Sequence, residues 1–403
     1  MFSRQSRSAA REQSTPEGFR TKAPAHEHAP DGIFLARPRS TLAGAPRLAV
    51  KDLLDTAGLT TTYGSTIFAD HVPTESAESV RLLEAAGYAT AGKTNLHEFA
   101  YGVTSENPHF GTVPNPVAPG RIAGGSSGGS AAALAAGLVE LALGTDSAGS
   151  IRIPAACCGV VGFKPTYGLV STHGCFPLAP THDHVGPMAR SVAACSLAME
   201  ALVPGWERRP LNSLSELRIA VAWLDGADPR VRARAEAAAG CFAHSATVQL
   251  PPLPRDGQPL WSNGFMREIA DVHRELYAQH AELYGAEVAT KIERCLAVRD
   301  EDCAGYGELQ ERARERLLTQ LEGFDLLLTP TVRFVAPRPG GPRTTELIDL
   351  TAAFNLVGWP ALALPSGPAE DELPASVQIV GRGGEDALVL AAGALLERAL
   401  RIP

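Results

Sequence analysis

The sequence predicts an α/β fold in one large domain. From residue 46 onward, short apolar stretches alternate with helical ones, as in a β-sheet whose faces are covered by helices. The apolar pattern is nowhere interrupted by a linker, which favours one domain over two. A length of 403 residues, with 45% apolar and 20% charged residues, suffices for a sizeable core and is typical of a globular protein.

The predicted elements alternate along the chain in the order that such a fold requires. Thr74, followed by Glu75 and Glu78, marks a helix start with acidic residues in its first turn. Residues 265–325 are strongly charged in a helical pattern, which predicts solvent-facing helices. The predicted strands are 47–50, 89–91, 324–328, 361–364 and 376–380, and the other predicted helices are 75–86, 131–143 and 385–400.

The first thirty residues differ in composition from the rest of the chain. They are rich in Arg and Ser and lack the apolar stretch that a secretory signal requires. An organellar transit peptide has the same bias. We expect residues 1–30 to be a disordered tail and residues 31–403 to form the domain.

Charge and composition exclude several classes of function. A formal net charge of −8 argues against a chain that binds a nucleic-acid backbone by itself. The longest apolar runs, 131–143 and 387–396, are shorter than the roughly 18–20 residues that span a bilayer, so no membrane segment is expected. Seven cysteines without a CxxC spacing favour a reduced, cytoplasmic setting and do not support a zinc site.

Two Gly/Ser-rich segments, 124–130 and 144–150, flank the small apolar stretch 131–143. A flexible linker is the ordinary interpretation of such a composition. Here, however, the segments adjoin buried elements, where glycines allow close backbone approach and consecutive N–H groups can bind an oxyanion. A phosphate-binding loop would need the GxxxxGK[ST] spacing, which is missing. The GxSxG pattern at 124–128 follows a predicted loop and not a strand, which disfavours an α/β-hydrolase fold.

A nucleophilic serine in these segments would need a base within hydrogen-bond reach. Only five of the 36 basic residues are lysines, so a lysine at a buried position suggests chemistry beyond charge. Arginine does not lose its proton in a protein, whereas a buried lysine can be neutral near pH 7. Lys51, at the end of the apolar strand 47–50, is therefore a candidate base. The structural alternative is an interior lysine paired with Asp52 or Asp55.

Histidines are the other candidates for a base or a metal ligand. His182 and His184 lie two residues apart in one predicted loop, where histidines are more often surface or structural residues than functional ones. His97-Glu98 lacks the second histidine four residues later that a zinc-binding helix needs. No metal site is therefore predicted.

Together, these motifs resemble the amidase signature family. The stretch 124–164 is similar to the family's signature almost residue for residue, residues 50–52 resemble its lysine strand, and segments within 92–116 resemble the run before the signature. The resemblance is dense over residues 42–200 and looser over 324–400. It implies a single amidase signature domain with a central mixed β-sheet covered by helices on both faces.

The resemblance also implies the roles of individual residues. Ser150 matches the acylated nucleophile, Ser126 matches the serine at a cis peptide bond that relays the proton, and Lys51 matches the base. The implied oxyanion hole consists of backbone N–H groups, those of Ser147, Ala148, Gly149 and Ser150. Ala148 stands where the family usually has glycine. Its N–H is retained, so we expect catalysis to survive, but a positive φ at this position would be strained.

The implied activity is hydrolysis of amide-type C–N bonds in small amides, aryl amides or carbamates through an acyl-enzyme, without a metal or organic cofactor. The alternative is the A-type glutaminase subunit of a tRNA-dependent amidotransferase, for which the chain is short and shows no clear glutamine-binding set. A non-catalytic scaffold is disfavoured because all three triad positions are filled. A homodimer is left open.

The region 173–335 is expected to determine the substrate. Phe176, with Pro177 and Leu178 after it, suggests a partly apolar pocket near the active serine. Arg333 could meet an acidic substrate. The alternatives are a plain core residue for Phe176 and a surface charge for Arg333.

Overall fold

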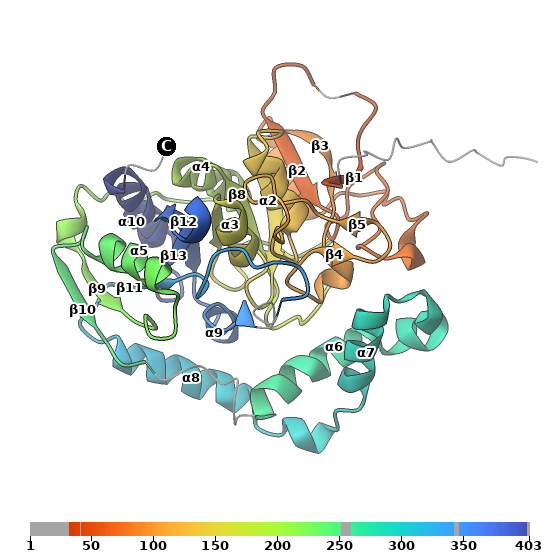
Figure 1. The fold of residues 1–403 in the computed structure, drawn as a ribbon. Coiled ribbons are helices and arrows are strands. Elements are labelled where there is room, and N and C mark those ends of the chain that lie inside the picture. The colour runs from red at the N-terminus through yellow and green to blue at the C-terminus, as the bar shows by residue number, and fades with distance from the viewer. Residues whose placement is uncertain (1–31, 41, 251–258, 342–345, 401–403) are drawn as a thin grey trace, which may run out of the picture.

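A computed structural model describes residues 32–40, 42–250, 259–341 and 346–400 and contains one α/β domain built on a large mixed sheet (Figure 1). The expected disordered tail, residues 1–30, lies outside the described residues. Among the described residues the main sheet has eleven strands, in the order β1-β3-β2-β6-β8-β7-β12-β13-β11-β9-β10. They are β1 (Phe34–Ala36), β2 (Arg47–Lys51), β3 (Ala89–Thr94), β6 (Leu141–Asp146), β7 (Val161–Lys164), β8 (His184–Ala189), β9 (Arg218–Val221), β10 (His244–Thr247), β11 (Leu326–Pro330), β12 (Ala361–Pro368) and β13 (Pro374–Val380).

The sheet is mixed, as expected. Strand β2 runs parallel to both of its neighbours, β3 and β6, and β9 runs parallel to β10 and β11. The strands between these two groups pair antiparallel. A separate two-stranded ribbon joins β4 (Glu106–Asn107) to β5 (Gly111–Thr112). Because β2 lies between β3 and β6, both parallel to it, its carboxyl end has a strand of the sheet on either side.

Helices cover both faces of the sheet. On one face, α1 (Glu78–Ala85), α4 (Val192–Leu202), α5 (Pro229–Ala239) and α10 (Asp386–Ala399) contribute to one large apolar core. On the other face, α2 (Gly128–Ala135) and α3 (Arg152–Cys158) form a second core with the strands. The short helix α9 (Ala352–Leu356) belongs to a further apolar cluster, in which Phe354 packs against Trp223.

The two faces differ in side-chain size, and the strand sequence shows why. In β2, Leu48 and Val50 point into the first core, whereas Ala49 between them points into the second. In β6, Leu141 and Leu143 alternate with Ala142 in the same way. Successive residues of a strand face opposite sides. The alanine face therefore allows the glycine- and alanine-rich helix α2 to approach the strands closely.

The predicted helix 131–143 is wrong in its second half. Helix α2 ends at Ala135, Gly137 follows at φ 70°, and Leu141 begins strand β6. An apolar run can form a buried strand as well as a buried helix, and the glycine at positive φ is what divides this one. The helix start expected at Thr74 also lies further along, because Ala77 is the N-cap of α1.

The charged region 265–325 is helical, as predicted. Helices α6 (Pro259–His280), α7 (Ala286–Leu296) and α8 (Tyr306–Gln320) lie alongside the sheet domain (Figure 1). The inner sides of α6 and α7 pack on an apolar cluster that includes Phe99 and Phe176. Within the described residues, no helix is both long and apolar enough to cross a membrane.

Candidate active site

Lys51 is the last residue of β2, and its side chain is fully buried. Its Nζ lies 2.6 Å from Ser126 Oγ and 2.7 Å from Thr145 Oγ1, which belongs to the neighbouring strand β6. The sheet thus holds the amine between a loop serine and a strand threonine. Burial lowers the pKa of Lys51 to about 7, which allows the amine to be neutral near physiological pH.

The structural alternative for Lys51, an ion pair with Asp52 or Asp55, is not present. Among the described residues, Lys51 forms no salt bridge. Asp52 instead accepts hydrogen bonds from the backbone and side chain of Thr62 and lies 3.7 Å from the Nζ of Lys93.

Ser126 sits in the Gly/Ser loop that precedes α2, after a cis peptide bond between Gly125 and Ser126. The cis bond agrees with the resemblance. The Ser126 carbonyl accepts hydrogen bonds from the His97 backbone N–H and from Ser105 Oγ, each at 3.2 Å. A Cβ at Gly128, the first residue of α2, would lie 2.4 Å from Ser105 Oγ, so this position needs glycine for the close approach.

Ser150 lies in the loop between β6 and α3, two residues before Arg152, where α3 begins. Its carbonyl accepts a hydrogen bond from Ser127 N at 3.2 Å, which joins the two Gly/Ser loops. The Ser150 hydroxyl is hydrogen-bonded to none of the described residues, and 6% of the residue is exposed. Ser127, which the sequence did not single out, also exchanges hydrogen bonds with the backbone of Thr145.

A buried ion pair shapes the loop between β6 and α3. Asp146 and Arg152, both fully buried, make two contacts of 3.0 Å each. Burial alone would raise the pKa of Asp146, but the Arg152 guanidinium holds it well below its usual range. Asp146 also accepts hydrogen bonds from the backbone N–H groups of Gly149 at 2.6 Å and Ile151 at 3.2 Å.

Arg152 is fixed in turn by residues about 200 positions later in the chain. It donates to Thr351 O at 3.0 Å, Gln378 Oε1 at 3.1 Å and Asn355 Oδ1 at 2.7 Å. The sequence alone gave Asn355 and Gln378 no role. A single arginine within the otherwise apolar stretch 151–158 is the one sequence signal that could have indicated such a network.

The expected oxyanion donors are not equivalent in this structure. The Gly149 N–H already donates to Asp146, whereas the N–H groups of Ser147, Ala148 and Ser150 donate to no described residue. Ala148 has no positive φ, so the expected strain at this departure from the family is absent. Gly149 takes the unusual angle instead, at φ 133°.

His182 and His184 are both buried and have structural partners. His184 Nδ1 lies 2.6 Å from His182 O and 3.1 Å from Asp146 O, and its Nε2 lies 3.1 Å from Lys164 Nζ. His182 contacts Tyr306 Oη at 3.0 Å. Among the described residues, no group of three or more His, Cys, Asp or Glu is arranged to hold a metal ion.

Phe176 belongs to an aromatic cluster close to the strand that carries Lys51. Its N–H donates to Leu53 O at 3.0 Å, and its ring lies 4.7 Å from Tyr63 and 5.3 Å from Phe99, centroid to centroid. A substrate role for Phe176 is a proposal that this placement near the lysine allows.

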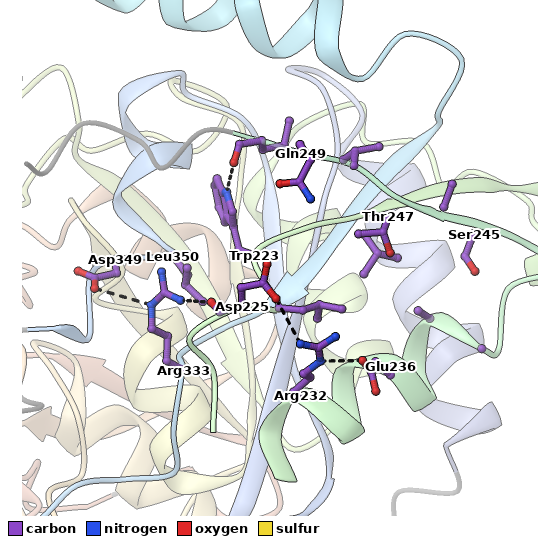
Figure 2. A pocket seen from close by; sticks show the side chains of 17 residues that line it. Trp223, Asp225, Arg232, Glu236, Ser245, Thr247, Gln249, Arg333, Asp349 and Leu350 are labelled. Atoms are coloured by element: carbon purple, nitrogen blue, oxygen red, sulfur yellow. Dashed lines mark hydrogen bonds and ion pairs between the residues drawn. The ribbon is translucent and has the colours of Figure 1, made fainter. Parts of the chain in front are cut away.

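Arg333 lies elsewhere, in a cavity of about 500 Å³ at the β9, β10 and α5 end of the sheet (Figure 2). It donates to Asp225 O at 2.6 Å and lies 3.8 Å from an Asp349 carboxylate oxygen. None of these contacts involves the residues around Lys51. A role for Arg333 in substrate binding therefore remains a proposal.

Comparison with known proteins extends over nearly the whole chain. The family model described as Amidase matches residues 13–390. The A-type subunit of the glutamyl-tRNA(Gln) amidotransferase of Thermus thermophilus is 37% identical, covering 90% of this chain and 86% of the relative. The AtzE subunit of the 1-carboxybiuret hydrolase of Pseudomonas sp. is 35% identical, covering 91% and 87%.

Solved structures agree with these sequence matches. A crystal structure of an amidase is 37% identical with a TM-score of 0.80, and the match covers 88% of this chain and 84% of that one. A 6-aminohexanoate cyclic dimer hydrolase is 28% identical with a TM-score of 0.77, covering 88% and 85%. With the paired Gly/Ser loops, the cis peptide bond and the buried lysine, these matches show that the chain belongs to the amidase signature family, whose enzymes act on C–N bonds.

Proposed function

We propose that this protein is an amidohydrolase that cleaves small amides, aryl amides or carbamates with Ser150 as nucleophile, Ser126 as proton relay and Lys51 as base. The observation that carries the proposal is the 2.6 Å contact between the buried Lys51 Nζ and Ser126 Oγ. A serine needs a neighbouring base to become a nucleophile, and a lysine whose pKa is about 7 can be that base.

The proposed chemistry starts from the Lys51–Ser126 contact and takes the step to Ser150 from the resemblance to the family. Neutral Lys51 takes a proton from Ser126, which takes one from Ser150, and Ser150 Oγ attacks the substrate carbonyl carbon. Backbone N–H groups of the 147–150 loop stabilise the oxyanion, each donor contributing on the order of a few kcal/mol. The relay then returns the proton to the leaving nitrogen as the C–N bond breaks. Water repeats the sequence on the acyl-enzyme, so the reaction calls for no metal or organic cofactor.

The second candidate is an amidotransferase A-type subunit that hydrolyses glutamine for a partner. The 37% identity to the Thermus thermophilus amidotransferase favours it. The 35% identity to the Pseudomonas 1-carboxybiuret hydrolase favours a hydrolase of small C–N substrates instead. We place the stand-alone amidase first because this chain shows no clear set of glutamine-binding residues.

The test is an assay of the purified chain against aliphatic, aryl and carbamate amides and glutamine. Ser150→Ala is assayed in parallel, with Ser215→Ala, an exposed serine of the short 3-10 helix Leu214–Glu216, as the matched control. We expect turnover of a non-glutamine amide that falls by at least about 10³-fold in Ser150→Ala and is unchanged in Ser215→Ala. Slow glutamine hydrolysis alone would favour the amidotransferase role. Full activity of Ser150→Ala would refute the proposed mechanism.

A further inference from the structure

The peptide unit between Ala148 and Gly149 is held at both of its polar ends. Its carbonyl accepts a hydrogen bond from Thr351 Oγ1 at 2.6 Å, and its N–H donates to Asp146 Oδ1 at 2.6 Å. A peptide unit is planar, and its C=O and N–H point in opposite directions. One donor on one side and one acceptor on the other therefore fix its rotation about the chain.

This rotation decides which way the neighbouring N–H groups can point. The N–H of Ala148 belongs to the preceding peptide unit and that of Ser150 to the following one. Neither is hydrogen-bonded to a described residue. The Gly149 N–H, in contrast, is already used by Asp146, so it is not available to an oxyanion while that bond persists.

Thr351 is itself firmly placed. It is fully buried, its N–H donates to Ile348 O at 3.1 Å, and its carbonyl accepts from Arg152 Nη1 at 3.0 Å. Its hydroxyl is 3.3 Å from Ile348 O, much longer than its 2.6 Å contact with Ala148 O. Thr351 also lies directly over Gly149, where an added Cβ would come within 2.3 Å of Thr351 Oγ1. The contact thus depends on both the glycine and the hydroxyl.

We propose that Thr351 is a positioning residue, which together with Asp146 fixes the Ala148–Gly149 peptide and so orients an oxyanion hole formed by the N–H groups of Ser147, Ala148 and Ser150, without that of Gly149. The inference rests on the proposed function, because it assigns the geometry of that same site. Thr351 acts only through the loop and does not touch the reacting atoms.

The test compares Thr351→Val, which keeps the shape and removes the hydroxyl, with Thr351→Ser, which keeps the hydroxyl and removes the methyl group. With an amide substrate from the panel, Thr351→Val should lower kcat about 10- to 100-fold and leave KM within about twofold, because the oxyanion develops only in the transition state. The affinity for a trifluoromethyl ketone, which forms a tetrahedral adduct, should fall by the same factor. Thr351→Ser should stay close to wild type.

Labelling of Ser150 by a fluorophosphonate, followed by intact-protein mass, gives a readout that needs no substrate. Thr351→Val should react at least about 10-fold more slowly, and thermal melting reports whether it is folded. If it is not, Thr351→Cys keeps the size with a weaker donor and should be intermediate between Val and Ser.

Equal losses in Thr351→Val and Thr351→Ser, or a change in KM alone, would overturn the positioning role while leaving the proposed function intact. Absence of both turnover and Ser150 labelling in the wild-type protein would refute the proposed function, and the positioning role with it.

Discussion

At the scale of single residues, two opposing influences meet at Lys51. Burial disfavours the ammonium form, while the carboxylates of Asp146 and Asp183 favour it. Burial is the larger effect, so the pKa of Lys51 falls to about 7. The two groups that contact Nζ are uncharged hydroxyls, so neither stabilises the ammonium form of Lys51 as a carboxylate would. A lysine in this setting can exchange a proton near neutral pH, which an arginine could not do.

This balance predicts the pH dependence of activity. Because the neutral amine is the active form, kcat/KM should fall about tenfold per pH unit below about 7 and level off above it. Burial raises the pKa of Asp183 to about 6, so its protonation would add a second effect at lower pH. The measurement is kcat/KM of the purified protein between pH 5 and 9.

Asp183→Asn tests whether the midpoint of that profile reports the pKa of Lys51. Removing this carboxylate removes a charge that favours protonated Lys51, so the midpoint should move below that of the wild-type protein. A flat wild-type profile between pH 5.5 and 8.5 would contradict a lysine base with a pKa near 7.

At the scale of elements, a second buried lysine ties β2 to β3. Lys93 Nζ donates to Thr56 Oγ1 and Thr61 Oγ1, each at 3.0 Å, and also to Leu54 O. It lies 3.7 Å from Asp52 Oδ1, an oxygen without a hydrogen bond among the described residues. Asp52 directly follows Lys51, so this pair fixes the strand end that carries the proposed base.

Lys93→Met should therefore destabilise the protein strongly. Removing one partner of a buried ion pair leaves the other charge unpaired, at a cost of about 3–5 kcal/mol in the free energy of unfolding. The double variant with Asp52→Asn should lose less than the sum of the two single losses, because it buries no unpaired charge. Urea denaturation at pH 7.5 measures all three variants.

The control is Lys291→Met in helix α7. Lys291 makes a partly exposed ion pair with Glu287 at 2.6 Å and donates to Tyr101 O at 3.0 Å, so its loss should cost about 1–2 kcal/mol. A loss for Lys93→Met no larger than that of Lys291→Met would show that the buried pair is not important for stability.

The sequence indicated five of the eleven strands that the main sheet has among the described residues, because short apolar stretches such as 47–50, 361–364 and 376–380 are too brief for buried helices. It also indicated Lys51, because lysines are rare in this chain. It could not separate helix α2 from strand β6, since one apolar run, 131–143, extends through both and only Gly137 and Glu140 interrupt it.

The network around Arg152 was equally hidden. Its partners Thr351, Asn355 and Gln378 lie about 200 positions away, and only the tertiary fold brings them together. Likewise, nothing in the sequence shows that Asp146 occupies the Gly149 N–H. Local sequence patterns predict helices and strands and draw attention to rare residue types. Hydrogen bonds between residues that are distant in the sequence can be identified only from the folded structure.

At the scale of the whole molecule, strand β2 and the loops before α2 and α3 carry the proposed triad, while helices α6 and α7 pack over the aromatic cluster that contains Phe176. The two parts are joined by a buried carboxylate. Glu98 Oε2 accepts from Gly285 N at 2.9 Å, immediately before α7, and Glu98 Oε1 lies 2.7 Å from His109 Nε2. Glu98 is fully buried, so its loss leaves both of these groups without their partner.

Glu98→Ala should thus loosen α7 without disturbing the sheet. Each unsatisfied buried group costs about 1–3 kcal/mol, which should speed hydrogen–deuterium exchange in Ala286–Leu296 at least about 10-fold. Exchange in the central strands β2 and β6 should stay at the wild-type rate, because they share no hydrogen bond with Glu98. Glu293→Ala, which removes an exposed contact of the same helix with Tyr277, is the control and should change little.

If Phe176 contacts substrate as proposed, Glu98→Ala should also raise KM for aryl amides more than it lowers kcat. Faster exchange throughout the sheet would instead mean that Glu98 supports the whole domain and not the attachment of α7.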